Sequence, residues 1–152
     1  MDKFYKNLIN ANILEFVKED MLKSVKDKEV VIYKTFNISA GHKLELNYES
    51  PCRSFHGHNF TISIWLKGKL DKNGMVADFQ EIKDIITDLF DHRHLNEVFK
   101  KNGLDANPTS EVLAISIYHI LKACYFGKLK VKVRVWETDT SYAEFGDKIE
   151  NG

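Results

Sequence analysis

Apolar residues change their spacing after the first 28 positions, and this change divides the chain. Before it they recur at mixed intervals of three, four and more, which favours one or two helices with an imperfect apolar stripe. These residues are Phe4, Leu8, Ile9, Phe16, Val17, Met21, Leu22 and Val25. From Val30 the interval becomes two, which is typical of a strand with one buried face. The sequence therefore predicts a helical extension over residues 1–28 and a domain that opens with a strand.

Two strands with matching faces are predicted on either side of a polar loop. The buried face of the first, interrupted only by Lys34, carries Ile32, Phe36, Ile38, Ala40 and His42. The buried face of the second, over about 56–68, carries His56, His58, Phe60, Ile62, Ile64 and Leu66. Residues 43–55 between them contain the turn formers Asn47, Ser50 and Pro51, which indicates a hairpin with a long loop.

Helical spacing then appears twice before the strand pattern returns. Asp78 followed by Glu81 resembles a capping box, so we expect a helix from there to Phe90. A second helix is expected to begin near Thr109 and to end before Gly127. Alternating residues over 129–137 and 141–145 predict two more strands. The order ββααββ predicts an α+β fold with an antiparallel sheet.

Length and composition narrow the class of protein. The chain has 152 residues, the size of one domain, which we place at residues 29–147 with a tail at 148–152. Lys plus Arg and Asp plus Glu number 22 each, and this balance argues against a nucleic-acid-binding or membrane-surface protein. Two cysteines, no apolar run of membrane-spanning length and no signal-like N-terminus predict a cytoplasmic protein with reduced thiols.

Three histidines share the predicted buried face. His56 and His58 are two residues apart on one strand, and His42 ends the neighbouring strand in the same phase. Unpartnered buried imidazoles are costly, so three of them in phase favour a metal over ordinary strand-end residues. Three neutral histidines with an open position are typical of catalytic Zn²⁺.

Cys52, four residues before His56, has two possible roles. It is either a fourth ligand in a closed structural site or a reactive thiol activated by a nearby cation. Cys124 lies in an apolar helix face and is expected to be an inert core residue.

Further acidic and polar residues are candidates for proton transfer and ligand binding. Asp91-His92 is either a charged helix end or an acid that orients a proton-shuttling histidine. Glu137 continues the buried face of the 129–137 strand, so it lies either at the exposed end of the strand or in a pocket, where a carboxylate suits a bidentate contact with an amidine-like N–H pair. Thr109 and Glu111 are most simply the N-cap and first-turn acid of their helix, with ligand contact as the alternative.

Six short motifs together resemble the 6-pyruvoyltetrahydropterin synthase and 6-carboxytetrahydropterin synthase family, over about residues 30–145. They occur in family order. They are Phe36-Asn37-Ile38-Ser39-Ala40-Gly41-His42, Cys52 with His56-Gly57-His58, Gly74-Met75-Val76-Ala77-Asp78-Phe79, Asp91-His92 with Leu95-Asn96, Pro108-Thr109-Ser110-Glu111, and Trp136-Glu137-Thr138.

The resemblance implies a tunnelling fold (T-fold), in which ββααββ subunits form barrels and two trimers stack into a homohexamer with active sites at subunit interfaces. It implies Zn²⁺ on His42, His56 and His58, and Cys52 as a proton-transferring thiol. By the same resemblance, Asp91 and His92 form an acid–base pair. Glu137 anchors a pterin, and Thr109 and Glu111 are weaker pterin contacts.

The length and composition of the loop before His56 and His58 distinguish the subfamilies of this family. Only Arg53-Ser54-Phe55 lies between Cys52 and His56, and none of the three is a carboxylate. This short spacing resembles the 6-carboxytetrahydropterin synthases of queuosine (7-deazaguanine) biosynthesis. It implies a lyase that converts 7,8-dihydroneopterin triphosphate to 6-carboxytetrahydropterin with loss of acetaldehyde and triphosphate. A 6-pyruvoyltetrahydropterin synthase and a non-catalytic zinc-structured oligomer are the alternatives.

Overall fold

The computed structural model describes residues 3, 6–7 and 12–150, so the expected apolar positions Phe4, Leu8 and Ile9 lie outside the described residues. A five-stranded sheet forms the body of the molecule, with strand order β3-β1-β2-β4-β5. Its strands are β1 (Glu29–His42), β2 (His56–Lys69), β3 (Arg93–His94), β4 (Lys130–Thr138) and β5 (Ser141–Gly146). The expected hairpin of two long strands is confirmed, because β1 and β2 pair antiparallel over their whole length.

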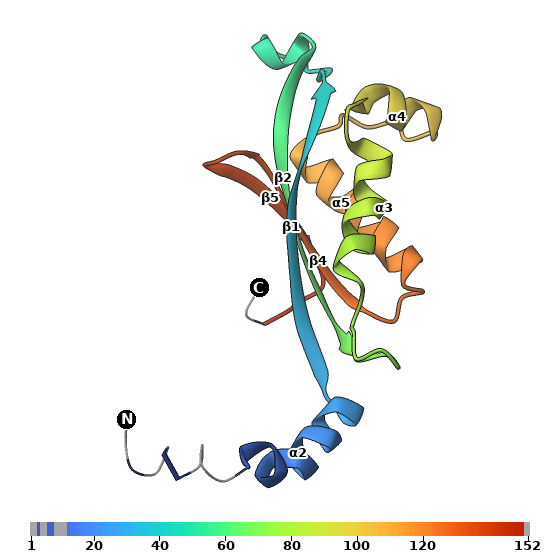
Figure 1. Cartoon of the computed structure of the whole chain (residues 1–152). Helices are drawn as coiled ribbons and strands as arrows, with labels where there is room; N and C mark the ends of the chain where they lie inside the picture. Colours follow the sequence, from blue (N-terminus) through green and yellow to red (C-terminus); the bar gives the residue numbers. More distant parts are fainter. Residues whose placement is uncertain (1–2, 4–5, 8–11, 151–152) are drawn as a thin grey trace.

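Three helices cover one face of this sheet (Figure 1). They are α3 (Phe79–Phe90), α4 (Leu95–Lys101) and α5 (Ser110–Cys124). Asp78 and Thr109 cap α3 and α5 as expected, with side-chain oxygens that accept hydrogen bonds from backbone N–H groups of the first turn. A fourth helix, α2 (Ile13–Asp27), lies in the predicted extension and stands away from the sheet beyond the start of β1 (Figure 1).

The core lies between the sheet and the three covering helices. The apolar in-facing residues of β1, β2 and β4 form its sheet side, and those buried to 1% exposure or less are Ile38, Phe60, Ile62, Ile64, Leu66, Val131, Val133 and Val135. Apolar stripes on the helices form the other side, including Ile82, Ile86, Leu113, Ile117 and Leu121. The period of two and the helical spacing in the sequence thus correspond to one continuous core.

The α+β class is confirmed, with two additions that the order ββααββ did not include. Helix α4 fills the interval between the two expected helices, with Leu95 and Phe99 buried. The two-residue strand β3 pairs parallel to β1, so the sheet is mixed rather than wholly antiparallel. Both elements are too short to produce a periodic pattern of their own. Of the helices in the described part of the chain, none is long and apolar enough to span a membrane.

A charged residue ties the end of β5 to the core. The Asp147 carboxylate accepts hydrogen bonds from Tyr118 Oη (2.9 Å), Lys122 Nζ (3.1 Å) and the Val131 backbone N–H (2.9 Å). Burial alone would raise the pKa of this carboxyl, but the hydrogen bonds and the Lys122 charge outweigh it and lower the pKa. The ionised form is therefore the one that stabilises the fold.

We expect Asp147→Ala to lower the free energy of unfolding by about 1–3 kcal/mol at pH 7, because three donors lose their acceptor. Because the pKa is lowered in the folded state, the carboxylate stabilises the fold fully at pH values above the ordinary aspartate pKa. This stabilisation is lost as pH falls through the folded-state pKa. The difference from wild type, measured by urea denaturation, should therefore shrink between pH 7 and pH 3. The exposed Asp88→Ala is the matched control, with a change within about 0.5 kcal/mol. Equal stabilities at pH 7 would contradict this.

Candidate metal and substrate site

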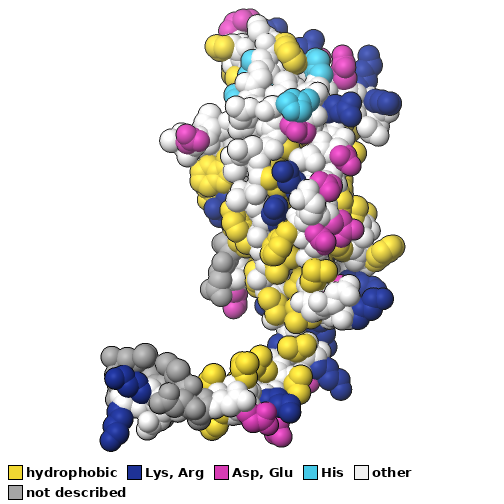
Figure 2. Space-filling view, in the orientation of Figure 1, with side chains coloured by type: hydrophobic (Ala, Val, Ile, Leu, Met, Phe, Trp, Pro, Cys, Tyr) yellow, Lys and Arg dark blue, Asp and Glu magenta, His cyan; other side chains and the backbone are white. Residues whose placement is uncertain are grey.

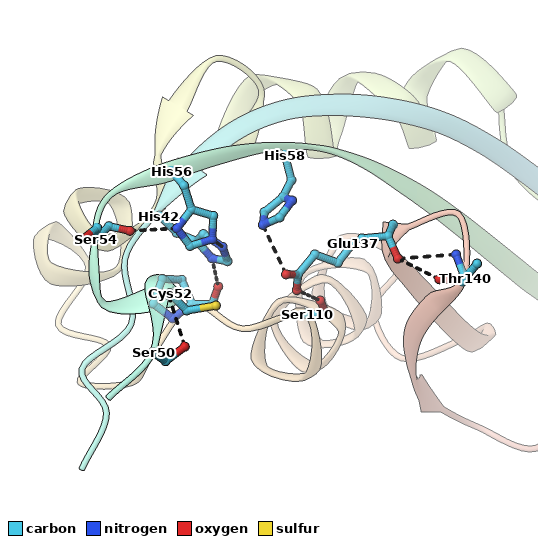
Figure 3. A network of polar contacts seen from close by, with 11 residues as sticks. His42, Ser50, Cys52, Ser54, His56, His58, Ser110, Glu137 and Thr140 are labelled. Atoms are coloured by element: carbon cyan, nitrogen blue, oxygen red, sulfur yellow. Dashed lines mark hydrogen bonds and ion pairs between the residues drawn. The ribbon is translucent and has the colours of Figure 1, made fainter. Parts of the chain in front are cut away.

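The three predicted histidines converge at one end of the sheet, on the face that the helices cover. The β1–β2 register places His42 directly opposite His56 and Ala40 opposite His58, so the alternation of the two strands points all three rings to one side. Ligand atoms of His42, His56, His58 and Glu137 lie within 4.8 Å of one another. His42 is 1% exposed and the other three are partly buried. Figure 3 shows this convergence.

Backbone carbonyls fix the tautomers of two of these rings. His42 Nδ1 lies 2.7 Å from the Pro108 carbonyl oxygen, and His56 Nδ1 lies 2.8 Å from the Ser54 carbonyl oxygen. A carbonyl oxygen only accepts, so each Nδ1 must carry the proton and donate it. In the neutral rings both Nε2 atoms are then unprotonated, with lone pairs available to a metal.

The lone pairs of the two Nε2 atoms point toward one position between the rings. His42 Nε2 and His56 Nε2 are 3.1 Å apart, where two unprotonated acceptors repel unless a cation or an additional proton lies between them. Two ligands at the usual Zn–N distance and a tetrahedral angle lie about 3.3 Å apart. The donor set and its spacing therefore fit a single divalent metal ion.

His58 completes the donor set. Its Nε2 lies 3.1 Å from Glu137 Oε1 but has no hydrogen-bond partner among the described residues, although the atom is buried. Burial lowers the pKa of His58, the Glu137 carboxylate opposes this, and His42 and His56 add to the lowering. The ring is thus neutral near pH 7, the form that binds a metal.

Glu137 is oriented by a residue that was not predicted from the sequence. The hydroxyl of Ser110 donates a 2.8 Å hydrogen bond to Glu137 Oε2, and Ser110 is 6% exposed. Its neighbours Thr109 and Glu111 have the simpler of their two predicted roles: Thr109 accepts from the Val112 N–H as the N-cap, and Glu111 is exposed in the first turn. A buried serine at the start of a helix has no distinctive sequence signal, because serine is common at helix N-termini.

Cys52 lies in the short helix η1 (Pro51–Arg53) of the loop between β1 and β2. Its carbonyl accepts a 2.8 Å hydrogen bond from the Leu44 N–H, which holds η1 against the end of β1. In Figure 3 the thiol points from this loop toward the side of the cluster where Glu137 lies. Within the described part of the chain, the fourth candidate ligand grouped with the histidines is Glu137 and not Cys52.

Asp91 and His92 lie beside β1 on the side away from β2. Asp91 Oδ1 accepts from the Ser39 N–H (2.8 Å), and its Oδ2 is 3.6 Å from His92 Nε2. His92 has a positive φ of 55°, its N–H donates to the Ser39 carbonyl, and its side chain is 82% exposed. Glu137 lies on β4, which neighbours β2 in the sheet. In the strand order, Asp91 and His92 are therefore on one side of the histidine cluster and Glu137 is on the other.

Comparisons with known proteins identify relatives of this chain. A family model described as 6-pyruvoyl tetrahydropterin synthase matches residues 31–148. The chain is 33% identical over 138 residues to a putative 6-carboxy-5,6,7,8-tetrahydropterin synthase of Pyrococcus horikoshii, which covers 74% of this chain and 87% of that protein. It is 34% identical over 123 residues to the 6-carboxy-5,6,7,8-tetrahydropterin synthase of Bacillus subtilis, which covers 76% and 84%.

Solved structures show the same fold, which confirms the predicted T-fold. The 6-pyruvoyl tetrahydropterin synthase of Caenorhabditis elegans matches with a TM-score of 0.64 and 27% identity, over 81% of this chain and 99% of that one. The 6-pyruvoyltetrahydropterin synthase of Plasmodium vivax, at 16% identity, matches with a TM-score of 0.61 over 81% of this chain and 100% of that one.

Proposed function

Because the chain belongs to the 6-pyruvoyl tetrahydropterin synthase family, we propose that it is a zinc-dependent pterin lyase. Its reaction converts 7,8-dihydroneopterin triphosphate and water to 6-carboxy-5,6,7,8-tetrahydropterin, acetaldehyde and triphosphate. The observation that carries this proposal is the convergence of three imidazoles beside Glu137. Two relatives that are 33% and 34% identical to this chain support it, because their names include 6-carboxy-5,6,7,8-tetrahydropterin synthase. The reaction would serve queuosine biosynthesis in the cytoplasm.

His42, His56 and His58 would hold the zinc ion. Neutral imidazoles suit Zn²⁺, and three of them leave a position open for substrate. When bound, the metal polarises and acidifies the hydroxyl groups of the substrate side chain. The Pro108 and Ser54 carbonyls keep two of the rings in the metal-binding tautomer.

Cys52, Asp91 and His92 would move protons. The Cys52 thiol is on the loop that closes over the cluster, where it can exchange a proton with the pterin ring or side chain. Asp91, fixed by the Ser39 N–H, orients His92. Since the His92 side chain is largely exposed, we propose that it acts at a site shared with a neighbouring subunit, in a hexamer built as two stacked trimers.

Glu137 would anchor the amino-pyrimidine edge of the pterin. Its carboxylate is oriented by Ser110 and lies 3.1 Å from His58 Nε2, so a ring held there would present its side chain to the histidines. A carboxylate accepts bidentately from two parallel N–H groups. Thr109 and Glu111, at the same helix start, are proposed as secondary pterin contacts.

We expect Glu137→Gln to raise KM at least ten-fold and to leave the zinc content unchanged, because the amide loses the paired acceptors while three ligands remain. Loss of the carboxylate also lets the pKa of His58 fall further, so zinc should be retained at pH 6 at least as well as in wild type. Steady-state kinetics and metal analysis after dialysis measure the two effects. Zinc loss in this variant would instead make Glu137 a metal ligand.

Identification of the pterin product by mass spectrometry tests the proposed reaction. Zinc-loaded protein incubated with 7,8-dihydroneopterin triphosphate should yield 6-carboxytetrahydropterin. Formation of 6-pyruvoyltetrahydropterin alone would identify the alternative enzyme, which shares the substrate and the metal but only eliminates triphosphate. No turnover by a zinc-loaded, folded oligomer would favour the non-catalytic alternative.

A further inference from the structure

The chain that follows β1 leaves the sheet between two parts of the candidate site. The pairing of β1 and β2 ends at His42 and His56, so residues 43–45 continue without a strand partner among the described residues. Backbone N–H and C=O groups that leave a strand ladder need other partners. Residue 43 directly follows the candidate ligand His42, and the Cys52 loop comes next along the chain. The path of residues 43–45 therefore determines how this loop meets the metal site.

Two asparagine side chains take the place of the missing strand. The Asn96 amide accepts from the Lys43 N–H (2.9 Å) and donates to the Lys43 carbonyl (2.8 Å). Asn107 makes the same pair of bonds with Glu45, both at 2.8 Å. An asparagine side chain carries an acceptor and a donor side by side, as a backbone residue of an antiparallel pair does. The four bonds form a double clamp on residues 43 and 45.

The clamping residues come from two different segments. Asn96 lies in the first turn of α4, beside the end of β1 (Figure 1), and Asn107 lies in the connection between α4 and α5. Pro108, the residue after Asn107, provides the carbonyl that accepts from His42 Nδ1. One connection therefore holds both the imidazole of His42 and the chain that leaves it, which ties the clamp to the metal site.

The clamp reaches the Cys52 loop through Leu44. Leu44 lies between the two clamped residues, and its N–H donates to the Cys52 carbonyl at 2.8 Å. At the other end of η1, the Ser54 carbonyl accepts from His56 Nδ1, also at 2.8 Å. The loop is thus held on one side by the clamped segment and on the other by a candidate metal ligand. Loss of the first contact frees one side of the loop.

We infer that Asn96 and Asn107 are positioning residues that set the Cys52 thiol relative to the metal. Fixing both neighbours of Leu44 fixes the direction of its N–H, and this N–H holds the backbone of Cys52. The asparagines act through the backbone and not on the substrate. Proton transfer requires hydrogen-bond reach, and a misplacement of about 1 Å is costly to a catalytic group. The inference rests on the proposed proton-transfer role of Cys52.

Hydrogen exchange at the Leu44 amide tests whether the clamp acts on the loop. Asn96→Ala and Asn107→Ala each remove two hydrogen bonds without adding a charge, and neither changes Leu44 or Cys52. In zinc-loaded protein with isotope-labelled leucine, NMR should show the Leu44 N–H exchanging at least ten-fold faster in each variant, because its local opening is easier. The Leu113 N–H, bonded within α5, is the internal reference. An unchanged Leu44 rate in both variants would overturn the inference.

The rate at which iodoacetamide alkylates Cys52 reports the position of the thiol without any turnover. Cys52 is partly exposed, and Figure 2 shows histidine side chains at the surface of this end of the molecule, so the reagent can reach it. At saturating zinc, Cys52 should react at least three-fold faster in both alanine variants, because the loop is freed on one side. Peptide mass spectrometry follows the reaction, with the exposed Cys124 as internal reference.

A third asparagine provides the matched control. The Asn102 side chain donates a 2.8 Å hydrogen bond to the Val98 carbonyl at the end of α4, the same type of bond as in the clamp but away from residues 43–45. Asn102→Ala should leave the Leu44 exchange rate and the Cys52 alkylation rate unchanged.

Aspartate variants keep the test decisive if loss of a whole side chain unfolds the protein. Asn96→Asp and Asn107→Asp retain the shape and the acceptor, but each carboxylate repels the backbone carbonyl that the amide had bonded. Leu44 exchange should again be faster. Alkylation is left to the alanine variants, because a new negative charge also acts on a thiol. Wild-type Leu44 exchange in folded aspartate variants would contradict the clamp.

Kinetics separate positioning from general stabilisation. The alanine variants should lower kcat at least ten-fold and leave KM unchanged, because the proposed pterin anchor Glu137 lies on β4, away from the clamp. A purely stabilising role predicts a lower unfolding temperature with wild-type kcat per folded enzyme, and that result would overturn the inference.

The outcomes also distinguish this inference from the proposed function. Faster Leu44 exchange and faster Cys52 alkylation with a lower kcat support both. The same two accelerations in a protein whose wild type has no activity support the clamp and contradict the proposed function. Faster Leu44 exchange with an unchanged Cys52 alkylation rate would show that the clamp does not set the thiol.

Discussion

His56→Ala should lose more than about 100-fold in zinc affinity and have no detectable turnover, while it remains folded. Removing a residue that only orients a metal ligand through a hydrogen bond lowers metal affinity by about 10–100-fold. His56 is proposed as a ligand itself, so its loss should have a larger effect. The His56→Ala substitution also removes one of the two Nε2 lone pairs that face each other. Its ring is partly exposed at the start of β2, so truncation should not open the core. Metal analysis after dialysis against a weak chelator, with circular dichroism, measures both effects.

His119→Ala is the matched control for this variant. His119 is exposed on α5 and stacks edge-on against Tyr118, in the half of the helix away from the site. Its removal should change neither zinc content nor turnover. Wild-type zinc affinity in His56→Ala would contradict the assignment of the cluster.

Cys52→Ala should retain zinc and lose about 10²–10⁴-fold in kcat, the usual contribution of a positioned proton-transfer group. The thiol is not among the grouped ligand atoms of the described residues, so the three imidazoles proposed as ligands remain. Kinetics and metal content of the same preparation measure the two quantities. Cys124→Ala is the control, because Cys124 is exposed at the end of α5 and the expectation that it is a core residue was wrong.

Loss of zinc and of the folded state in Cys52→Ala would have a different meaning. It would identify Cys52 as a fourth ligand of a structural site, the alternative that the spacing of Cys52 and His56 left open. Wild-type turnover in a folded, zinc-loaded variant would contradict a catalytic role.

The alternation of apolar residues was sufficient to predict the parts of the site that lie on long strands. His42, His56 and His58 occupy the same phase as Ile38 and Phe60, so one register brings them together. The alternation of side chains along a strand and the register of a hairpin strongly constrain which residues meet, because a shift of one residue would turn every buried side chain outward.

The groups that orient these residues could not be predicted in the same way. The Pro108 and Ser54 carbonyls are backbone atoms, present at every position, and only the folded chain selects which of them meets an imidazole. Ser110 and the two clamping asparagines lie in short connections or at helix starts, where polar residues are common for local reasons. Their partners are 27 to 62 residues away in the sequence.

Zinc-dependent release of acetaldehyde and triphosphate in equal amounts is the most direct test of the central claim. Zinc-loaded protein and chelator-treated protein are each supplied with 7,8-dihydroneopterin triphosphate, and both co-products are quantified. We predict one acetaldehyde and one triphosphate per substrate consumed, no turnover after chelation, and recovery when zinc is restored. Triphosphate release without acetaldehyde, or full activity in the metal-free protein, would contradict the claim that this site is a zinc-dependent carbon–carbon lyase.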